Sequence, residues 1–192
     1  MNKISRNVLS TAVGAAILSL CGLAHAEGTI KIAVAGPITG SVAQYGDMQM
    51  SGAKMAVEQI NAKGGVDGKK LEAVLMDDVC EPKQAVAIAN QIVNQKIKYV
   101  VGHLCSGSTQ PASKLYEEEG VLMITPAATN PAITQQGYKM VFRTIGTDDQ
   151  QGPTAGKYIA TKVKPKKLAI IHDKQQYGEG IAKEVDKTVK AA

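Results

Sequence analysis

The sequence predicts an α/β fold built on a doubly wound parallel sheet. Apolar, strand-like runs alternate with helical patterns from residue 27 to the end of the chain, and two of these runs end in polar turns of small residues. Strands that alternate with helices at this spacing require βαβ crossovers, which make the strands of the sheet parallel. In an open parallel sheet, neighbouring turns at the carboxyl ends of the strands are where ligands bind.

Six apolar runs predict the extended segments of this fold. In chain order they cover residues 30–36, 71–76, 99–104, 121–125, 138–144 and 168–172. The third run reads as a buried parallel strand because Val100 and Val101 are flanked by Ile97 and Leu104. Asp77 and Asp78 follow the second run, and we expect both to cap the turn there.

Helical patterns separate these runs. Two of them place four apolar residues at i, i+3, i+4 and i+7, namely Ala53, Ala56, Val57 and Ile60, then Ala85, Ile88, Ala89 and Ile92. Ser41 leads into the first helix, Gly64-Gly65 ends it, and Pro82 starts the second. Further helices are expected over residues 112–119, over residues 154–163 and from about residue 178 onward.

Two polar turns at predicted strand ends form the candidate site. Small hydroxyl residues over 106–109 follow one strand, and Pro111 then opens a helical pattern at a position where its missing N–H costs little. In the second turn Thr129 and Asn130 are cap candidates, and Pro131 takes the first helical position. A helix N-terminus presents free N–H groups and a positive dipole end, which suit a carboxylate or a phosphate.

The first 26 residues have the pattern of a secretory signal peptide. Lys3 and Arg6 precede an uncharged apolar run over residues 8–23, and Ala24-His-Ala26 supplies small residues before the expected cleavage site after Ala26. We therefore expect export to the periplasm. Cys21 raises the alternative of a lipoprotein, although Leu20 is a poor residue to precede a lipidated cysteine.

Export changes the interpretation of the two remaining cysteines. Cys80 and Cys105 each lie just past a predicted strand end, and in an oxidising compartment we expect them to form a disulfide. Closing a loop of this length is worth about 3.5 kcal/mol on the chain-entropy estimate. Two buried free thiols are the alternative, and a catalytic thiol is disfavoured because oxidation would consume it.

Charge and composition exclude several classes of function. Removing the signal peptide with Lys3 and Arg6 lowers the net charge from +5 to +3, and the remaining lysines are scattered singly along the helices. With one Phe, no Trp and no basic stripe, the chain is not expected to bind nucleic acid. The Gly36–Gly40 turn lacks the third glycine of a dinucleotide fingerprint. No P-loop, no metal-spaced His/Cys cluster and no nucleophile elbow is present, so neither a cofactor nor a metal is expected.

The polar stretch over residues 146–152 is the best candidate for a linker. The predicted organisation is therefore a signal peptide over 1–26, a first lobe over 27–146, and a linker with the start of a second lobe over 147–192. One strand and one helix cannot bury their apolar faces alone, so the second lobe looks unfinished.

Several segments closely resemble the periplasmic branched-chain amino-acid-binding proteins, the Leu/Ile/Val-binding subunits of ATP-driven uptake systems. The resemblance covers the chain after residue 26 and is densest in these segments: Gly40-Ser-Val-Ala-Gln-Tyr-Gly46, Asn61-Ala-Lys-Gly-Gly65, Gly102-His-Leu-Cys-Ser106, Ser108-Thr-Gln-Pro-Ala-Ser113, Leu122-Met-Ile-Thr-Pro-Ala127 and His172-Asp-Lys-Gln-Gln-Tyr-Gly178. It implies the type I periplasmic-binding-protein fold, two α/β lobes that close on one ligand, and no catalytic activity. Family members are about twice this length.

The resemblance also implies the role of each site residue. Ser106 would bind the ligand carboxylate with Thr129 beside it, while the Ala127 carbonyl and the Thr129 hydroxyl would accept from the ammonium group. Leu104, Cys105 and Tyr45 would line the apolar part of the pocket, and Tyr177 would close over the ligand. Tyr at position 45 favours a broad Leu/Ile/Val preference, because leucine-selective relatives have Trp there. Plain helix capping is the alternative for Ser106 and Thr129, at about 1 kcal/mol each.

The leading functional hypothesis is a monomeric subunit that captures Leu, Ile or Val and delivers it to a membrane ABC permease. A sensing module of the same fold that acts through a receptor is the first alternative. A hydrolase using Ser106 or Ser108 with His103 is the second, and it lacks a third partner. We expect His103 and His172 to be structural, since neither has an acid at useful spacing. Residues 27–192 by themselves are expected to bind the amino acid poorly.

Overall fold

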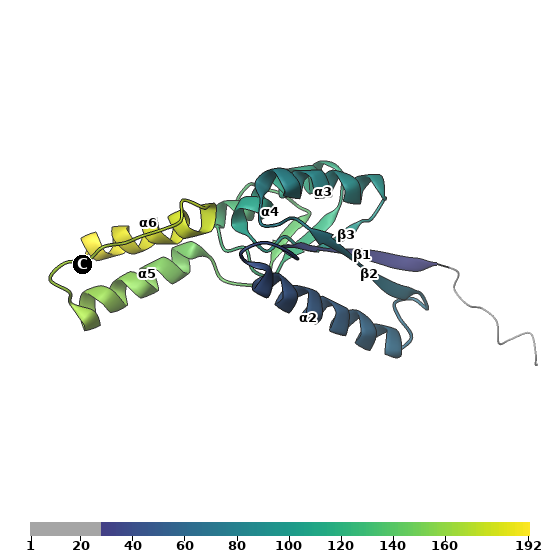
Figure 1. The fold of residues 1–192 in the computed structure, drawn as a ribbon, viewed down its shortest axis with the longest axis horizontal. Coiled ribbons are helices and arrows are strands. Elements are labelled where there is room, and N and C mark those ends of the chain that lie inside the picture. The colour runs from purple at the N-terminus through teal and green to yellow at the C-terminus, as the bar shows by residue number, and fades with distance from the viewer. Residues whose placement is uncertain (1–27) are drawn as a thin grey trace, which may run out of the picture.

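The computed structural model describes residues 28–192, so the predicted signal peptide, its cleavage site and Cys21 lie outside the described residues. Five parallel strands form one sheet in the order β2-β1-β3-β4-β5 (Figure 1). In chain order the strands are β1 (Thr29–Gly36), β2 (Lys70–Asp77), β3 (Tyr99–Gly102), β4 (Leu122–Thr125) and β5 (Val141–Arg143). The predicted α/β class and parallel sheet are confirmed.

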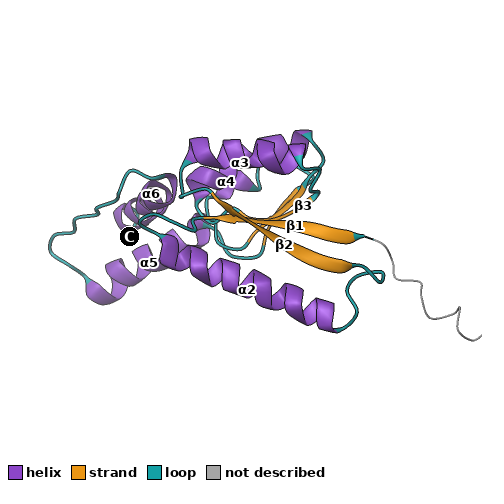
Figure 2. Cartoon of the chain, turned by 45° about the vertical axis from the view of Figure 1, so that its right-hand side comes forward, coloured by secondary structure: helices purple, strands orange, loops and turns teal. Residues whose placement is uncertain are grey.

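Helices cover both faces of the sheet. Helix α2 (Ala43–Ala62) lies on one face, and α3 (Pro82–Asn94) and α4 (Ser106–Glu118) lie together on the other (Figure 2). Strand β2 lies on one side of β1, and β3, β4 and β5 follow on the other side, so the strand order reverses at β1. The sheet is therefore doubly wound, with its topological switch point between β1 and β3.

The principal core lies between the sheet and the pair α3–α4. It contains Ile88 and Ile92 of α3, Tyr116 of α4 and Met123 of β4, all buried. The close approach of β3 to β1 requires glycine at position 102. Gly102 has φ +141°, and a Cβ there would lie 2.1 Å from the carbonyl oxygen of Ala35.

The last part of the chain forms two helices that pack on each other beyond the carboxyl edge of the sheet (Figure 1). Helix α5 (Asp148–Tyr158) continues into a short π-helix, η2 (Ile159–Val163), and α6 (Gln176–Lys190) returns alongside it. A Cβ at Gly152 would lie 2.3 Å from Cβ of Glu184. Glycine therefore permits close contact between the two helices, and this packing offsets its poor helix propensity.

The strand predicted over residues 168–172 is wrong. This segment is irregular, and Ile171 is 91% exposed. A strand needs a neighbour to satisfy its backbone N–H and C=O groups, and no strand of the described residues pairs with this one. An apolar run alone cannot supply that neighbour.

Two boundaries also differ from the sequence-based expectation. Helix α4 begins at Ser106 and not at Ala112, so Pro111 lies inside the helix and removes one of its backbone hydrogen bonds. Within the polar stretch 146–152, α5 already begins at Asp148, after Thr147 donates its N–H to Oε1 of Gln150 at 3.2 Å. A capping box of Thr147 and Gln150 therefore starts α5 earlier than its apolar pattern predicts, whereas Cys105 precedes α4 without a side-chain cap.

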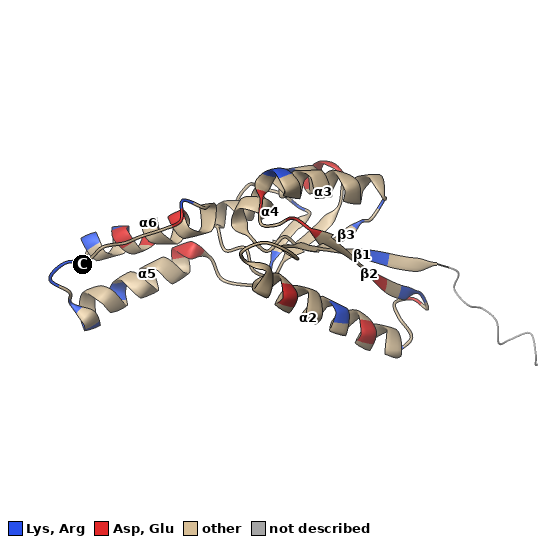
Figure 3. Cartoon of the chain, in the orientation of Figure 1, with Lys and Arg blue, Asp and Glu red and all other residues tan. Residues whose placement is uncertain are grey.

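Acidic and basic residues are interspersed along the helices of the described chain (Figure 3). On α6, Lys183 pairs with Glu179 and Lys190 with Asp186, each one turn apart. Exposed pairs of this kind stabilise a helix by only a few tenths of a kcal/mol. Across residues 28–192, no helix has the length and apolar composition needed to cross a membrane.

Candidate functional site

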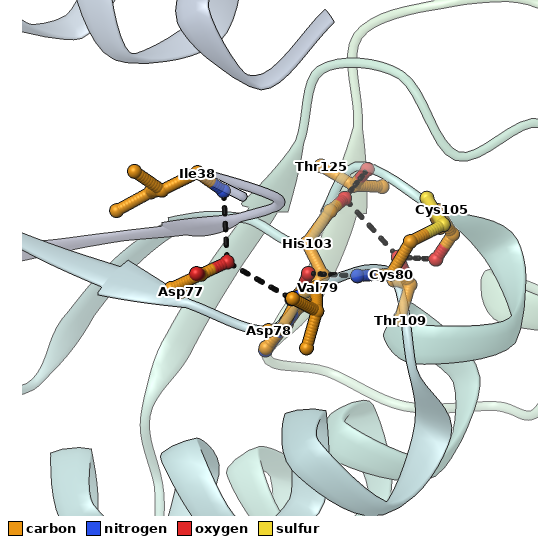
Figure 4. Close-up of a disulfide and its surroundings, with 9 residues drawn as sticks. All are labelled: Ile38, Asp77, Asp78, Val79, Cys80, His103, Cys105, Thr109 and Thr125. Carbon is orange, nitrogen blue, oxygen red and sulfur yellow. Dashed lines mark hydrogen bonds and ion pairs between the residues drawn. A yellow bond between two sulfur atoms is a disulfide. The ribbon is translucent and has the colours of Figure 1, made fainter. Parts of the chain in front are cut away.

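A disulfide ties the end of β2 to the start of α4. Cys80 follows the turn after β2, Cys105 is the residue immediately before α4, and their Cα atoms are 5.5 Å apart (Figure 4). The predicted pairing of Cys80 with Cys105 is confirmed. The bond anchors the first turn of α4, which carries Ser106, to the turn after β2.

Next to the disulfide, a buried chain of polar side chains connects the same elements. Nδ1 of His103 lies 2.6 Å from Oδ2 of Asp78, and Nε2 of His103 lies 3.0 Å from the hydroxyl of Tyr116. All three side chains are fully buried. Burial, reinforced by the charge of Asp78, raises the pKa of Tyr116 well above its ordinary value, so the phenol stays protonated. The network therefore fits an imidazole that donates from Nδ1 and accepts at Nε2.

The expectation that no acid lies within useful reach of His103 is wrong, because the fold brings Asp78 onto the ring from 25 residues away. The expected capping role of the two aspartates is confirmed. Asp78 accepts from the N–H of Cys80 at 2.9 Å. Asp77 accepts from the N–H of Val79 at 3.0 Å and also holds the turn after β1 through Ile38 (Figure 4).

The carbonyl oxygen of His103 joins the two candidate turns. It accepts from the hydroxyl of Thr125 at 2.7 Å and from the hydroxyl of Thr109 at 3.1 Å. Thr125 ends β4 and Thr109 lies in the first turn of α4, so one buried carbonyl fixes both elements relative to β3. This arrangement positions the two polar turns side by side.

The two turns meet at Ser106. Its side chain is 2% exposed, and its Oγ accepts from the N–H of Asn130 at 3.3 Å. The side chain of Asn130 in turn accepts from the N–H of Ala132 at 3.0 Å and caps the 3-10 turn η1 (Pro131–Ile133), as predicted. Thr129 is 6% exposed, and its hydroxyl faces the carboxylate of Asp148, where it opposes the rise in pKa that burial causes. The structure thus brings Ser106 and the Thr129 turn together at the carboxyl edge.

An apolar groove of about 730 Å³ lies between α2 and the sheet. Tyr45, Leu104 and Ala127 line it, so three of the predicted site residues share one cavity wall. Gln49 is the one polar side chain of its lining other than Tyr45, and its Nε2 donates to the carbonyls of Ala35 and Val101. Sequence reasoning did not single out Gln49, because a lone amide on a helix carries no recognisable signal.

Cys105 and Tyr177, like Ser106 and Thr129, lie outside this groove. Cys105 contributes its sulfur to the disulfide before α4. Tyr177 is about half exposed in the first turn of α6, and it lines neither this groove nor the smaller cavity at α6. Among the described residues, no cluster of three His, Cys, Asp or Glu side chains is arranged to hold a metal ion.

The family described as Periplasmic binding protein matches residues 29–192. The chain belongs to the periplasmic binding protein family. A relative from Pseudomonas aeruginosa, named Leucine-, isoleucine-, valine-, threonine-, and alanine-binding protein, is 64% identical over 177 residues, covering 92% of this chain and 48% of the relative. The Leu/Ile/Val-binding protein of Escherichia coli is 59% identical over 177 residues, with the same coverage.

Solved structures of this family share the fold. The branched-chain amino acid transporter substrate binding protein LivJ from Streptococcus pneumoniae, in complex with isoleucine, superimposes with a TM-score of 0.78 at 35% identity, covering 84% of this chain and 47% of LivJ. A leucine binding protein LivK from Thermotoga maritima also gives a TM-score of 0.78, at 29% identity, with 84% and 46% coverage. The fold is that of a type I periplasmic binding protein, and the chain spans about half the length of the relatives it matches.

We expect the disulfide to form in the exported protein. Thiol titration of denatured, unreduced protein that begins after residue 26 should detect no free sulfhydryl, because both cysteines of that segment are bonded. Reduction should lower the free energy of unfolding by about 3.5 kcal/mol. Two titratable thiols per chain would contradict this expectation.

The buried Asp78–His103 contact should be worth more than the His103–Tyr116 contact. Asp78→Ala removes a charged acceptor and should cost about 3 kcal/mol of unfolding free energy, whereas Tyr116→Phe should cost about 1 kcal/mol. Asp47→Ala on the exposed side of α2 is the matched control, with an expected effect below about 0.5 kcal/mol. Urea unfolding measures all three, and a cost for Asp78→Ala no larger than for the control would refute the role of this contact.

Proposed function

We propose that this chain forms the carboxylate-binding edge and one apolar wall of a periplasmic receptor for branched-chain amino acids, which delivers Leu, Ile or Val to an ABC permease. The observation that carries the proposal is the meeting of Ser106 with the Thr129 turn beside an apolar groove. A free amino acid has an anionic end, a cationic end and an apolar side chain. The edge of this sheet offers one partner for each.

The anionic end fits the start of α4. The first turn of a helix has backbone N–H groups without intrahelical acceptors and the positive end of the helix dipole. Ser106 is the first residue of α4, and no acidic residue lies in that turn. We infer that the α-carboxylate binds there through Oγ of Ser106 and the neighbouring amides. The disulfide and the His103 carbonyl hold this turn in place before the ligand arrives.

The apolar side chain fits the end of the groove lined by Tyr45 and Leu104. Removing aliphatic surface from water is worth about 25 cal/mol per Å², and an apolar wall selects aliphatic over polar side chains. The Ala127 carbonyl and the Thr129 hydroxyl would accept from the ammonium group. Cys105 and Tyr177 complete the proposed set, with Tyr177 closing over the ligand when a second lobe approaches.

The relatives support this ligand class. The Pseudomonas aeruginosa and Escherichia coli proteins are named for branched-chain amino acids, and the LivJ structure contains isoleucine. In the same proposal the signal peptide is cleaved after Ala26, the protein acts in the periplasm as a monomer, and residues 27–146 and 147–192 belong to different lobes. The gene product that contains this chain would bind without catalysis. Both ring nitrogens of His103 are already hydrogen-bonded inside the core, which argues against a Ser–His hydrolase.

A sensing protein of the same fold would bind the same ligands and contact a receptor. Acidic and basic residues are scattered along the described helices, which favours neither partner (Figure 3). Recovery of the leucine-loaded protein with a permease would support delivery, whereas recovery with a receptor would support sensing.

Replacing the hydroxyls at the meeting point should weaken ligand binding. In the full-length gene product that contains this chain, Ser106→Ala and Thr129→Ala should each reduce leucine affinity by about 1.5–3 kcal/mol, the range for hydrogen bonds to charged groups. Ser113→Ala is the matched control, because Ser113 is a buried serine of the same helix whose Oγ donates to the carbonyl of Gln110. Isothermal titration calorimetry measures each variant.

Helix capping, the alternative role of these two hydroxyls, is wrong, because α4 follows Cys105 without a side-chain cap and Asn130 caps η1. Loss of a contact within the protein alone should lower stability by about 1 kcal/mol and leave affinity unchanged. Unchanged affinity in both Ser106→Ala and Thr129→Ala would therefore mean that these hydroxyls only stabilise the turns, and the proposed site would be abandoned.

A further inference from the structure

Residues 157–167, the basic segment, contain an uninterrupted group of positive charges. Five exposed lysines lie within these eleven residues, namely Lys157, Lys162, Lys164, Lys166 and Lys167, and no Asp or Glu occurs between residues 150 and 172. None of the five forms an ion pair with another described residue. The expected scattering of single lysines along the helices does not hold here, since three of the five lie in the loop that follows η2.

The basic segment lies at the end of the α5–α6 pair that points away from the sheet (Figure 1, Figure 3). The carboxyl-terminal ends of the two helices meet there, because a Cβ on Gly156 would be only 2.6 Å from Cβ of Thr188. Lys187 and Lys190, at this end of α6, are already paired with acidic residues of their own helix. The charge of the basic segment is therefore not neutralised by residues 28–192.

The backbone presents these lysines on a sharp turn. Lys164 adopts the left-handed conformation at φ +49° and donates its N–H to the carbonyl of Ile159 at 2.8 Å, which ends η2. Pro165 follows and cannot extend a helix. Residues 162–167, which include four of the lysines, span at most about 20 Å. This is about two Debye lengths at 0.1 M salt, so the four ammonium groups attract an anionic surface together.

The composition of the segment favours a lipid surface over a folded acidic protein. Tyr158, Val163 and Leu168 are exposed among the lysines. No Arg, whose planar fork recognises one carboxylate with two hydrogen bonds, occurs between residues 150 and 172. Lysine is a point charge on an apolar stem, which can lie along the boundary between lipid headgroups and acyl chains. Lysines mixed with exposed apolar and aromatic side chains are typical of segments that bind anionic headgroups.

We propose that the basic segment binds the anionic phospholipid surface of a membrane. A lysine near such a surface strengthens binding by about fivefold, so several together give a reversible attachment. The segment is separate from the Ser106 turn, and the inference goes beyond amino-acid binding and does not depend on it. Attachment would keep the protein close to the membrane that contains the proposed permease.

Vesicle co-sedimentation of the full-length gene product that contains this chain tests the inference. The protein should bind vesicles of mixed phosphatidylglycerol and phosphatidylcholine, should not bind vesicles of phosphatidylcholine alone, and should be released as the salt concentration rises. The triple variant Lys164→Gln/Lys166→Gln/Lys167→Gln should bind the mixed vesicles about 100-fold more weakly, because three contributions of about fivefold are lost. The matched control removes three exposed lysines elsewhere and should bind like the unmodified protein: Lys54→Gln/Lys63→Gln/Lys69→Gln.

Two results would overturn the inference directly, namely no binding to the mixed vesicles and an equal loss in the triple variant and its control. Polyglutamate is the third arm. If the same lysines bind it more tightly than the mixed vesicles, the segment belongs to an acidic protein partner and the inference is also overturned.

Thermal unfolding checks that each variant folds. Lys166→Gln/Lys167→Gln, which leaves the left-handed Lys164 in place, is a second variant with an expected loss of about 25-fold. Leucine affinity should be the same in the unmodified protein and in all of these variants. Failure of the unmodified protein to bind leucine would therefore contradict the proposed function and leave the lipid-binding inference standing.

Discussion

The buried contact between His103 and Asp78 is the constraint on which the ligand-side edge of the sheet depends. It joins the residue after β3 to the residue after β2, and both are fully excluded from water. A charged group in that position is stable only while its partner stays in place. Because the same histidine presents its carbonyl to Thr109 and Thr125, the side-chain contact also fixes where α4 begins and where β4 ends. The Cys80–Cys105 disulfide joins the turn after β2 to the start of α4 covalently, next to the same contact (Figure 4).

The rigidity of this corner favours ligand binding. Ligand groups bind best to donors that are already oriented, since ordering a loop at the moment of binding costs affinity. Ser106 stands one residue after the disulfide, and its hydroxyl also contacts the neighbouring turn. Thr129 is fixed from the side of α5, because its carbonyl accepts from the N–H of Asp148 and its hydroxyl faces the carboxylate of the same residue.

The sequence predicted those elements that are determined by residues close together in the chain. The apolar spacing of Ile88 and Ile92 marked the buried face of α3, and the small residues after β3 marked the candidate site. The residues that were missed depend on distant partners. The acid at His103 comes from 25 positions earlier in the chain, and Asp148 is buried only because α6 covers it. Residues 168–172 failed as a strand for the same reason, because pairing is decided by a neighbour and not by the segment.

The central claim is that an amino acid binds where the start of α4 meets the Thr129 turn, beside the apolar groove. A crystal structure of the full-length gene product with leucine tests such binding most directly. We predict that the leucine carboxylate lies within hydrogen-bond distance of Oγ of Ser106, with the isobutyl group against Tyr45 and Leu104. Leucine bound elsewhere, for example deep in the groove along α2 and without contact to Ser106, would contradict this site.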